Sequence, residues 1–213
     1  MKKYVFLLMA ATSTTTIAAT YVGLEYGVTS IDHNYSTTYS ADSVSLSPDD
    51  SSDTFGGFIG YRINDFGLEL GYKKFESDDS QSKMINPSEQ AGFSQEREWD
   101  ADLDATQLTV KPVYFYNFND KLQLKTGLGL TYTQYKYNSS SQDEFELITN
   151  DDIESTKNRS GGESQKDTVL GGIASVGIEY MVIPNLALGA SASYQVDNIA
   201  NSSSFMLSSA YYF

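Results

Sequence analysis

The stretch FGGFIGYRINDFGLELGYKK, residues 55–74, decides the fold. Large apolar residues recur at alternate positions on both sides of a central Asn–Asp pair, namely at Phe55, Ile59, Tyr61 and Ile63 before it and at Phe66, Leu68, Leu70 and Tyr72 after it. The positions between them carry glycine, Arg62, Glu69 and Lys73. A period of two is that of a β-strand, whose successive side chains point to opposite faces. The stretch therefore predicts a β-hairpin that turns at Asn64 and Asp65.

The same alternation recurs in six further segments. They cover residues 21–30, 107–116, 122–133, 170–180, 186–196 and 205–213. Together with the hairpin they make eight predicted strands, each about as long as the 9–11 residues that a tilted strand needs to cross a bilayer.

The connections alternate in length. Short turns at residues 64–65, 117–120 and 183–185 follow the second, fourth and sixth strands, whereas longer loops cover about 31–53, 76–104 and 138–167, with a shorter one at 197–203. Most of the 28 acidic residues lie in these loops. Short turns at one end and long polar loops at the other are typical of an outer-membrane barrel. We predict an all-β fold, an eight-stranded antiparallel transmembrane up-and-down β-barrel over residues 21–213.

Residues 1–20 are predicted to be a cleaved signal peptide. Two lysines precede an apolar run from Tyr4 to Ala11, and small residues follow at Ala18 and Ala19, where cleavage is expected. The apolar run is too short for a transmembrane helix. The chain has no cysteine, so disulfides are excluded. Its formal net charge of −14 argues against nucleic acid as a partner.

Alternation alone does not say which face is outside, because a soluble lipocalin-like barrel uses the same pattern inside out. Aromatic residues gather at both ends of the apolar face, as they do at the two interfaces of a membrane barrel. An open sheet in lipid would leave edge N–H and C=O groups unpaired, so the last strand is expected to pair with the first.

The opposite face is expected to fill the lumen with a charge network of Glu25, Arg62, Glu69, Lys73, Lys111, Lys125 and Glu179. Its positive and negative groups nearly balance, as a low-dielectric interior requires. Within this network, Arg62 is expected to pair with Glu69, and Lys125 with Glu179. Eight strands leave an interior just wide enough for side chains, so a wide pore is not expected and a narrow gated ion channel is the alternative.

These segments resemble the small eight-stranded outer-membrane barrel superfamily, which includes OmpX, the OmpA N-terminal barrel and opacity-type, porin-like proteins. The resemblance covers the mature chain through YVGLEYG, GGFIGYRIND–FGLELGY, VGIEYMVIPNLALG and the terminal SSAYYF. It implies an outer-membrane location in a Gram-negative bacterium, with loops extracellular and termini periplasmic. It also implies that the last strand resembles the signal read by the barrel assembly machinery, with Phe205, Leu207, Tyr211 and Phe213 at its apolar positions.

We expect no enzyme activity, catalytic residue, metal or cofactor. The expected role is a surface or structural one, in adhesion, host or envelope interaction, or membrane stabilisation, through the acidic loops. Expected partners are outer-membrane lipid, lipopolysaccharide and an unidentified host or cell-surface ligand, and the chain is expected to be a monomer. The enzymatic alternative is a lipid A acyltransferase or deacylase that uses the sole histidine, His33, with Ser77 and Asp78 at the same rim.

Overall fold

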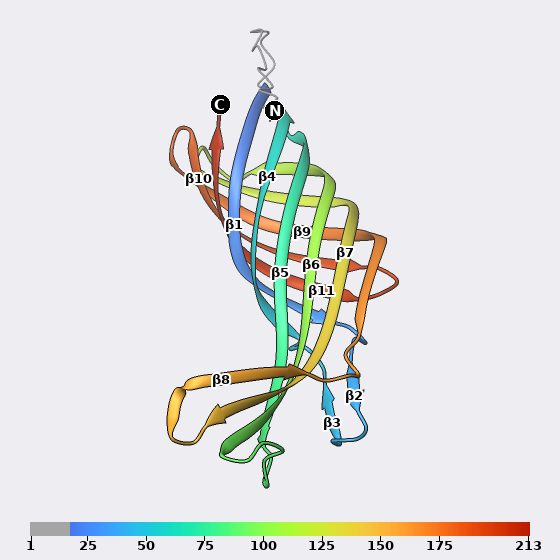
Figure 1. The fold of residues 1–213 in the computed structure, drawn as a ribbon. Helices are drawn as coiled ribbons and strands as arrows, with labels where there is room; N and C mark the ends of the chain where they lie inside the picture. The colour runs from blue at the N-terminus through green and yellow to red at the C-terminus, as the bar shows by residue number, and fades with distance from the viewer. Residues whose placement is uncertain (1–17) are drawn as a thin grey trace, which may run out of the picture.

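The computed structural model describes residues 18–213, except for the side chains of Ala18, Asn150 and Asp151. Its secondary structure is entirely β, and eight strands close into a ring (Figure 1). The ring consists of β1 (Ala18–Asp32), β4 (Ser51–Ile63), β5 (Phe66–Met84), β6 (Phe93–Asn117), β7 (Leu122–Leu147), β9 (Ser164–Ile183), β10 (Leu186–Val196) and β11 (Asn201–Tyr212).

Each ring strand is antiparallel to the next one along the chain. The pairing of β1 with β11, from Tyr21↔Tyr212 to Asp32↔Asn201, closes the ring. Every strand edge of the ring is therefore paired, and the predicted fold class is confirmed. Asn64, in the turn between β4 and β5, adopts a left-handed φ of 54°, which asparagine tolerates better than most residues.

Burial alternates along the ring strands. In β11, Phe205 and Leu207 are 55% and 59% exposed, whereas Met206 between them is 2% exposed. Large apolar side chains point outward from all eight ring strands, and the narrow interior takes the alternate residues. This inverts the arrangement of a soluble barrel.

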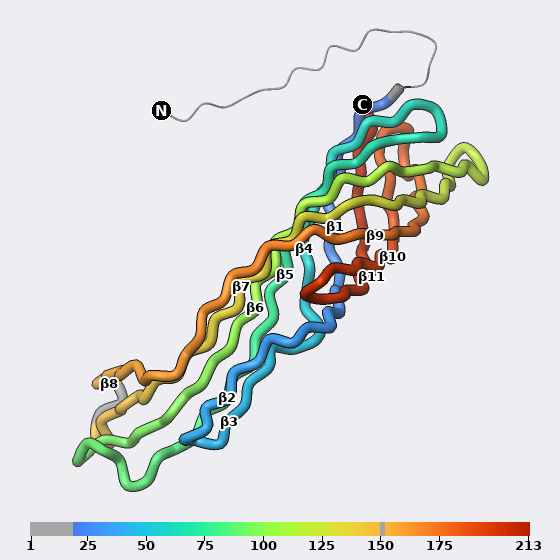
Figure 2. The backbone as a smooth tube through the Cα atoms, turned by 90° about the vertical axis from the view of Figure 1, so that its right-hand side faces the viewer, coloured from blue at the N-terminus to red at the C-terminus, as the bar shows by residue number. Residues whose placement is uncertain are grey.

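Four ring strands continue well beyond the ring, so the segments predicted as loops at 76–104 and 138–167 are mostly strand. The β5–β6 ladder runs on to Met84↔Glu96, the β6–β7 ladder to Phe93↔Leu147, and the β7–β9 ladder to Asn138↔Ser164. A further strand, β8 (Asn150–Asn158), pairs with the end of β7. We call residues 75–84, 93–106, 134–147 and 150–158 together the distal sheet (Figure 2).

The segment 31–53, also predicted as a loop, contains the hairpin of β2 (Thr37–Tyr39) and β3 (Val44–Leu46), which forms a separate two-stranded sheet. Tyr39 and Leu46 from this hairpin pack in one buried cluster with Trp99 and Leu103 of β6 and Tyr137 of β7. The distal sheet thus has a hydrophobic core of its own, and the burial of these side chains stabilises an ordered structure where polar composition predicted loops.

The two ends of the described chain lie at the short-turn end of the ring (Figure 1). There the backbone N–H of Phe213 donates to the carbonyl oxygen of Thr20 at 2.9 Å. The predicted signal peptide lies outside the described residues, apart from residues 18–20, which belong to β1. Its cleavage stays a prediction.

Candidate functional site: the filled lumen and the distal sheet

The structure brings four of the seven predicted lumen charges together at one level of the ring. Lys125 Nζ lies 2.6 Å from Glu69 Oε1 and 2.9 Å from Glu179 Oε1. Lys111 Nζ lies 3.1 Å from Glu69 Oε2, because Glu69 and Lys111 are register partners on β5 and β6. The two carboxylates are buried, and each has at least one cation beside it. Burial of charge in this lumen is tolerated because the charges are paired.

Neutral donors complete the coordination of the two carboxylates. The Tyr21 hydroxyl donates to Glu69 at 3.0 Å, and the Tyr212 hydroxyl donates to Glu179 at 2.7 Å. The Gln123 side-chain amide also donates to Glu179, at 2.7 Å. These three residues on β1, β11 and β7 were not among the predicted site residues. Their inward position follows from the strand alternation, which is the signal that would have found them.

Arg62 does not pair with Glu69, contrary to the prediction. Its guanidinium donates to the Gln123 side chain at 2.8 Å and to the Asn64 carbonyl at 2.5 Å, and lies 4.2 Å from the centroid of the Phe115 ring. The β4–β5 register explains the difference, because it places Arg62 opposite Gly67, nearer the short turn than Glu69. The predicted pair of Lys125 with Glu179 is present.

The remaining predicted charges, Glu25 and Lys73, lie on the other side of the ion-pair level. Both border a cavity of about 60 Å³ that Lys111 and Lys125 also line. Lys73 is 8% exposed, and its ammonium lies 3.4 Å from the Ser204 hydroxyl. A cavity of this size holds a few water molecules at most.

Beyond the cavity, side chains fill the ring again. The Thr54 hydroxyl donates to Thr29 at 2.7 Å, and the side-chain amide of Gln107 bonds that of Gln195. The lumen thus passes from charged to uncharged polar layers and then to the apolar cluster beneath the hairpin.

The lumen is less polar than predicted near the short turns. A buried cluster there contains Tyr21, Phe58, Val113, Phe115 and Tyr212. Lys125 Nζ lies 4.3 Å from the centroid of Phe58, so the ring face contributes to holding the ammonium. Glycines make room for these rings: a Cβ on Gly60 would lie 2.2 Å from Tyr21 Cζ. Aromatic rings occupy this part of the lumen because a narrow interior must be filled and because cations pack well on aromatic faces.

The predicted assembly-signal residues all lie on the outer face at β11 and its end. Phe205, Leu207, Tyr211 and Phe213 are between 44% and 73% exposed. The rings of Tyr211 and Phe213 meet edge to face with centroids 5.0 Å apart. Their role in assembly stays a prediction.

The distal sheet has an acidic outer face. Five acidic residues alternate along β6, at Glu96, Glu98, Asp100, Asp102 and Asp104. Their neighbours Trp99, Ala101 and Leu103 are buried on the other face. The register places Asp78 of β5 directly opposite Asp102, an unfavourable arrangement of like charges. Burial, and then the charge of Asp78, raise the pKa of the Asp102 carboxyl above its ordinary value.

The alternative catalytic residue His33 is held by the backbone. Its Nδ1 accepts from the N–H of Tyr35 at 3.2 Å, so its Nε2 donates to the carbonyl oxygen of Pro48, also at 3.2 Å. The Ser77 hydroxyl is buried and donates to the carbonyl oxygen of Asp49 at 2.5 Å. The hydrogen bonds of His33 and Ser77 therefore go to backbone groups and do not form a nucleophile–base pair.

Among the side chains that the structure describes, no three of His, Cys, Asp or Glu form a group suited to hold a metal ion. Residues 18–213 include no helix of the length and hydropathy that a membrane span requires.

A closed ring with an apolar outer surface and a filled lumen defines an integral membrane β-barrel. The chain belongs to the outer membrane protein beta-barrel domain family, whose model matches residues 4–213. It is an outer-membrane β-barrel protein. No curated protein matches the sequence.

The fold is shared by solved structures that include the following three. Neisserial surface protein A is 16% identical, with a TM-score of 0.54 over 92% of this chain and 99% of that one. Ail of Yersinia pestis, in complex with the heparin analogue sucrose octasulfate, is 17% identical, with a TM-score of 0.52 over 92% and 99%. OprG of Pseudomonas aeruginosa is 13% identical, with a TM-score of 0.51 over 92% and 96%.

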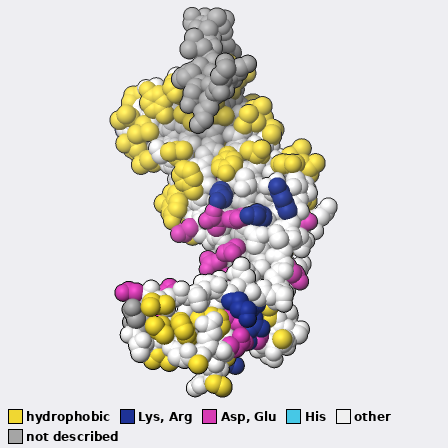
Figure 3. Space-filling view, viewed as in Figure 1, with side chains coloured by type: hydrophobic (Ala, Val, Ile, Leu, Met, Phe, Trp, Pro, Cys, Tyr) yellow, Lys and Arg dark blue, Asp and Glu magenta, His cyan; other side chains and the backbone are white. Residues whose placement is uncertain are grey.

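The outer surface of the ring is therefore the lipid-facing surface. Figure 3 shows hydrophobic side chains covering the ring end of one face, with Lys, Arg, Asp and Glu lying toward the distal sheet. Aromatic side chains stand at both edges of the apolar band: for example, Tyr61 and Tyr180 near the short turns, and Tyr26 and Tyr194 near the other end, are between 46% and 55% exposed. Tyrosine suits the membrane–water interface because its ring is apolar and its hydroxyl is polar.

Proposed function

We propose that this protein is a non-enzymatic surface protein of a Gram-negative outer membrane, with the distal sheet outside the cell and the short turns in the periplasm. Its role is adhesion, host or envelope interaction, or membrane stabilisation. The observation that carries this proposal is the combination of a filled lumen with an ordered sheet that has its own core and extends beyond the ring. The barrel acts as a rigid anchor, and the distal sheet acts as the contact surface.

The filled lumen supports an anchoring role over transport. Ion pairs at Glu69, Lys125 and Glu179 cross the ring interior, and the hydroxyl and amide layers and the hairpin core follow above them. The alternative, a narrow gated ion channel, requires these layers to separate in turn. We expect no conductance for the purified protein in planar bilayers, and steady single-channel steps would contradict the anchoring role.

The acidic outer face of β6 supports a partner that carries positive charge. Asp100, Asp102 and their neighbours create a negative potential on one side of a sheet that projects beyond the lipid-facing ring. The structure of Ail holds a heparin analogue, which is a polyanion, and such a ligand would be repelled by this face of the present chain. The unidentified host or cell-surface ligand is therefore proposed to be cationic.

The test compares adhesion of bacteria that display the protein to beads coated with polylysine or with heparin. We expect binding to polylysine beads, falling when Asp78, Asp100 and Asp102 are all replaced by Asn. The matched control replaces the outward Thr106, Gln134 and Asn138 by Ala, which leaves the charge unchanged. Equal binding by both variants, or a preference for heparin, would refute the acidic face as the contact surface.

The contacts of His33 do not favour the acyltransferase alternative, because both of its ring nitrogens bond backbone groups. Lipid A from cells that express the wild type and the His33→Ala variant is expected to have the same mass spectrum. An acyl-chain difference between the two would overturn the non-enzymatic assignment.

A further inference from the structure

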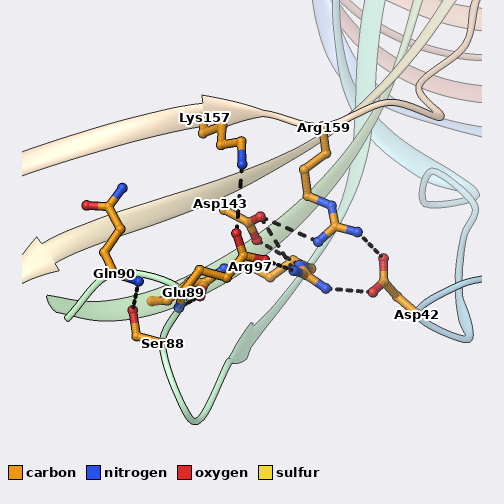
Figure 4. A network of polar contacts seen from close by, with 9 residues as sticks. Asp42, Ser88, Glu89, Gln90, Arg97, Asp143, Lys157 and Arg159 are labelled. Carbon is orange, nitrogen blue, oxygen red and sulfur yellow. Dashed lines mark hydrogen bonds and ion pairs between the residues drawn. The ribbon is translucent and has the colours of Figure 1, made fainter.

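A partly buried ion-pair cluster fastens the β2–β3 hairpin to the distal sheet (Figure 4). Asp42, in the turn of the hairpin, places one carboxylate oxygen 2.8 Å from Arg97 Nη1 and the other 3.2 Å from Arg159 Nη2. Arg97 belongs to β6, and Arg159 follows β8. A single carboxylate thus bridges two guanidinium groups from separate segments, which is the geometry by which arginines bind an oxyanion.

The two acidic residues of this cluster differ in how firmly they are held. Asp143 is part of β7, its side chain is 4% exposed, and it lies 2.7 Å from Arg97 Nε. Asp42 is on a turn, with its side chain 14% exposed, and the next residue, Ser43, has a left-handed φ of 58°. Asp143 therefore belongs to the sheet, whereas Asp42 is carried into the cluster by the hairpin.

The charge balance of the cluster depends on Asp42. Arg97, Arg159 and Lys157 supply three positive charges, and Asp42, Asp143 and Glu89 supply three negative charges. Removing Asp42 leaves an excess of one positive charge, concentrated on the two guanidinium groups that Asp42 had bridged. An external anion is then the natural replacement.

The part of the distal sheet that the hairpin covers contains polar groups without hydrogen-bond partners. The Trp99 indole N–H and the Ser141 hydroxyl are buried without a hydrogen-bond partner, and Trp99 is the register partner of Ser141. Each such group costs about 1–3 kcal/mol relative to its hydrated state. The hairpin also pairs only with itself, so no ladder of backbone hydrogen bonds ties it to the distal sheet. Lifting the hairpin hydrates these groups and so recovers part of the energy of the contacts that are broken.

We propose that Arg97 and Arg159 form an anion-binding site that Asp42 occupies as a tethered ligand, and that an external oxyanion such as a phosphate group displaces Asp42 and releases the hairpin. When the hairpin dissociates, the inner face of the distal sheet around Trp99 becomes exposed. This inference goes beyond the proposed function, since it concerns the inner face of the sheet and an anionic ligand rather than the acidic outer face.

The chain contains one tryptophan, Trp99, so tryptophan fluorescence reports only on the inner face of the distal sheet around this residue. Trp99 is 1% exposed in the closed arrangement. The experiment measures acrylamide quenching of Trp99 in the full chain, folded in detergent micelles, during a titration with inorganic phosphate. Sodium chloride at equal ionic strength is the control for screening. We expect saturable quenching with phosphate and little change with chloride.

Three variants separate the site from general destabilisation. Asp42→Asn is expected to raise quenching without phosphate, and calorimetric titration should give phosphate binding about tenfold tighter than in the wild type, because the competing carboxylate is gone. Arg159→Gln is expected to abolish phosphate binding. Lys166→Gln, at an exposed position on β9 outside the cluster, is the matched control and should behave as wild type.

Heat-modifiable migration on SDS gels verifies that each variant retains a folded barrel. The proposal is overturned if Asp42→Asn leaves Trp99 protected and binds phosphate no better than the wild type. It is also overturned if phosphate and chloride quench equally, or if Arg159→Gln binds phosphate as the wild type does.

Discussion

Replacing Lys125 by Met tests whether the lumen is held by its ion pairs. Lys125 is the one cation within ion-pair distance of Glu179 among residues 18–213, whereas Glu69 keeps Lys111 when Lys125 is lost. The variant therefore leaves one buried carboxylate, 3% exposed, with only neutral donors. Breaking a buried pair in this way costs about 3–5 kcal/mol of unfolding free energy. Replacing Glu179 by Gln in the same chain removes the uncompensated charge and is expected to recover part of this loss.

The assay is equilibrium unfolding by urea in phospholipid vesicles, followed by the fraction of protein that migrates as the folded barrel on unheated gels. Lys166→Met, at an exposed position on β9, is the control and is expected to change the unfolding free energy by no more than about 0.5 kcal/mol. The reasoning is refuted if Lys125→Met costs less than about 1 kcal/mol, or if adding Glu179→Gln makes the barrel less stable than Lys125→Met alone.

Three further predictions concern other parts of the molecule. Gly60→Ala is expected to prevent formation of a stable barrel, because the added Cβ would lie 2.2 Å from Tyr21 Cζ. The control Gly172→Ala, whose added Cβ would have no neighbouring atom nearer than 4.0 Å, should fold normally. Equal gel mobility of the two variants would contradict this prediction. The raised pKa of Asp102 means that the distal sheet loses stability as pH rises through that pKa. Asp102→Asn should therefore stabilise the sheet at pH 7, by less than about 0.5 kcal/mol because solvent screens this exposed side chain, and have no effect once the carboxyl is protonated. Urea unfolding followed by Trp99 fluorescence measures both. Phe213→Ala should lower the amount of assembled barrel in the outer membrane more than Phe55→Ala, which removes another outward aromatic, on β4. Similar yields of the two would argue against a signal role for Phe213.

Strand alternation determined most of the ring from sequence alone. Residues 55–74 indicated a hairpin turning at Asn64, and the structure forms β4 and β5 there. The period of two is a local property, because it follows from the backbone geometry of a single strand. Alternation sorts the residues into two faces, and the aromatic residues at both ends of the apolar face predicted that this face points outward. Residues on the other face, such as Glu69 and Lys125, were therefore predicted to point inward.

The extent of the strands was not recognised from composition. In the segment EREWDADLD, residues 96–104, every second residue is acidic, and this raised the average polarity to that of a loop. The alternate residues Trp99, Ala101 and Leu103 carried the strand signal, but only packing against Tyr39 and Leu46 makes them a core. That partner hairpin lies far away in sequence, at residues 37–46, and its position is decided by tertiary structure.

The sequence by itself therefore determined which side chains of the ring face inward and which face lipid, because strand alternation sorts them into two faces and the aromatic residues indicate which face meets lipid. The pairing of those inward side chains was decided by the tertiary structure. Arg62 and Glu69 looked like partners across a turn, yet the register sends Arg62 to Gln123 and joins Glu69 to Lys111 and Lys125. Ring closure and strand register bring distant residues to the same height, and neither quantity is encoded in any one segment. The contact between Asp42 and the two arginines likewise exists only once the hairpin has folded onto the distal sheet.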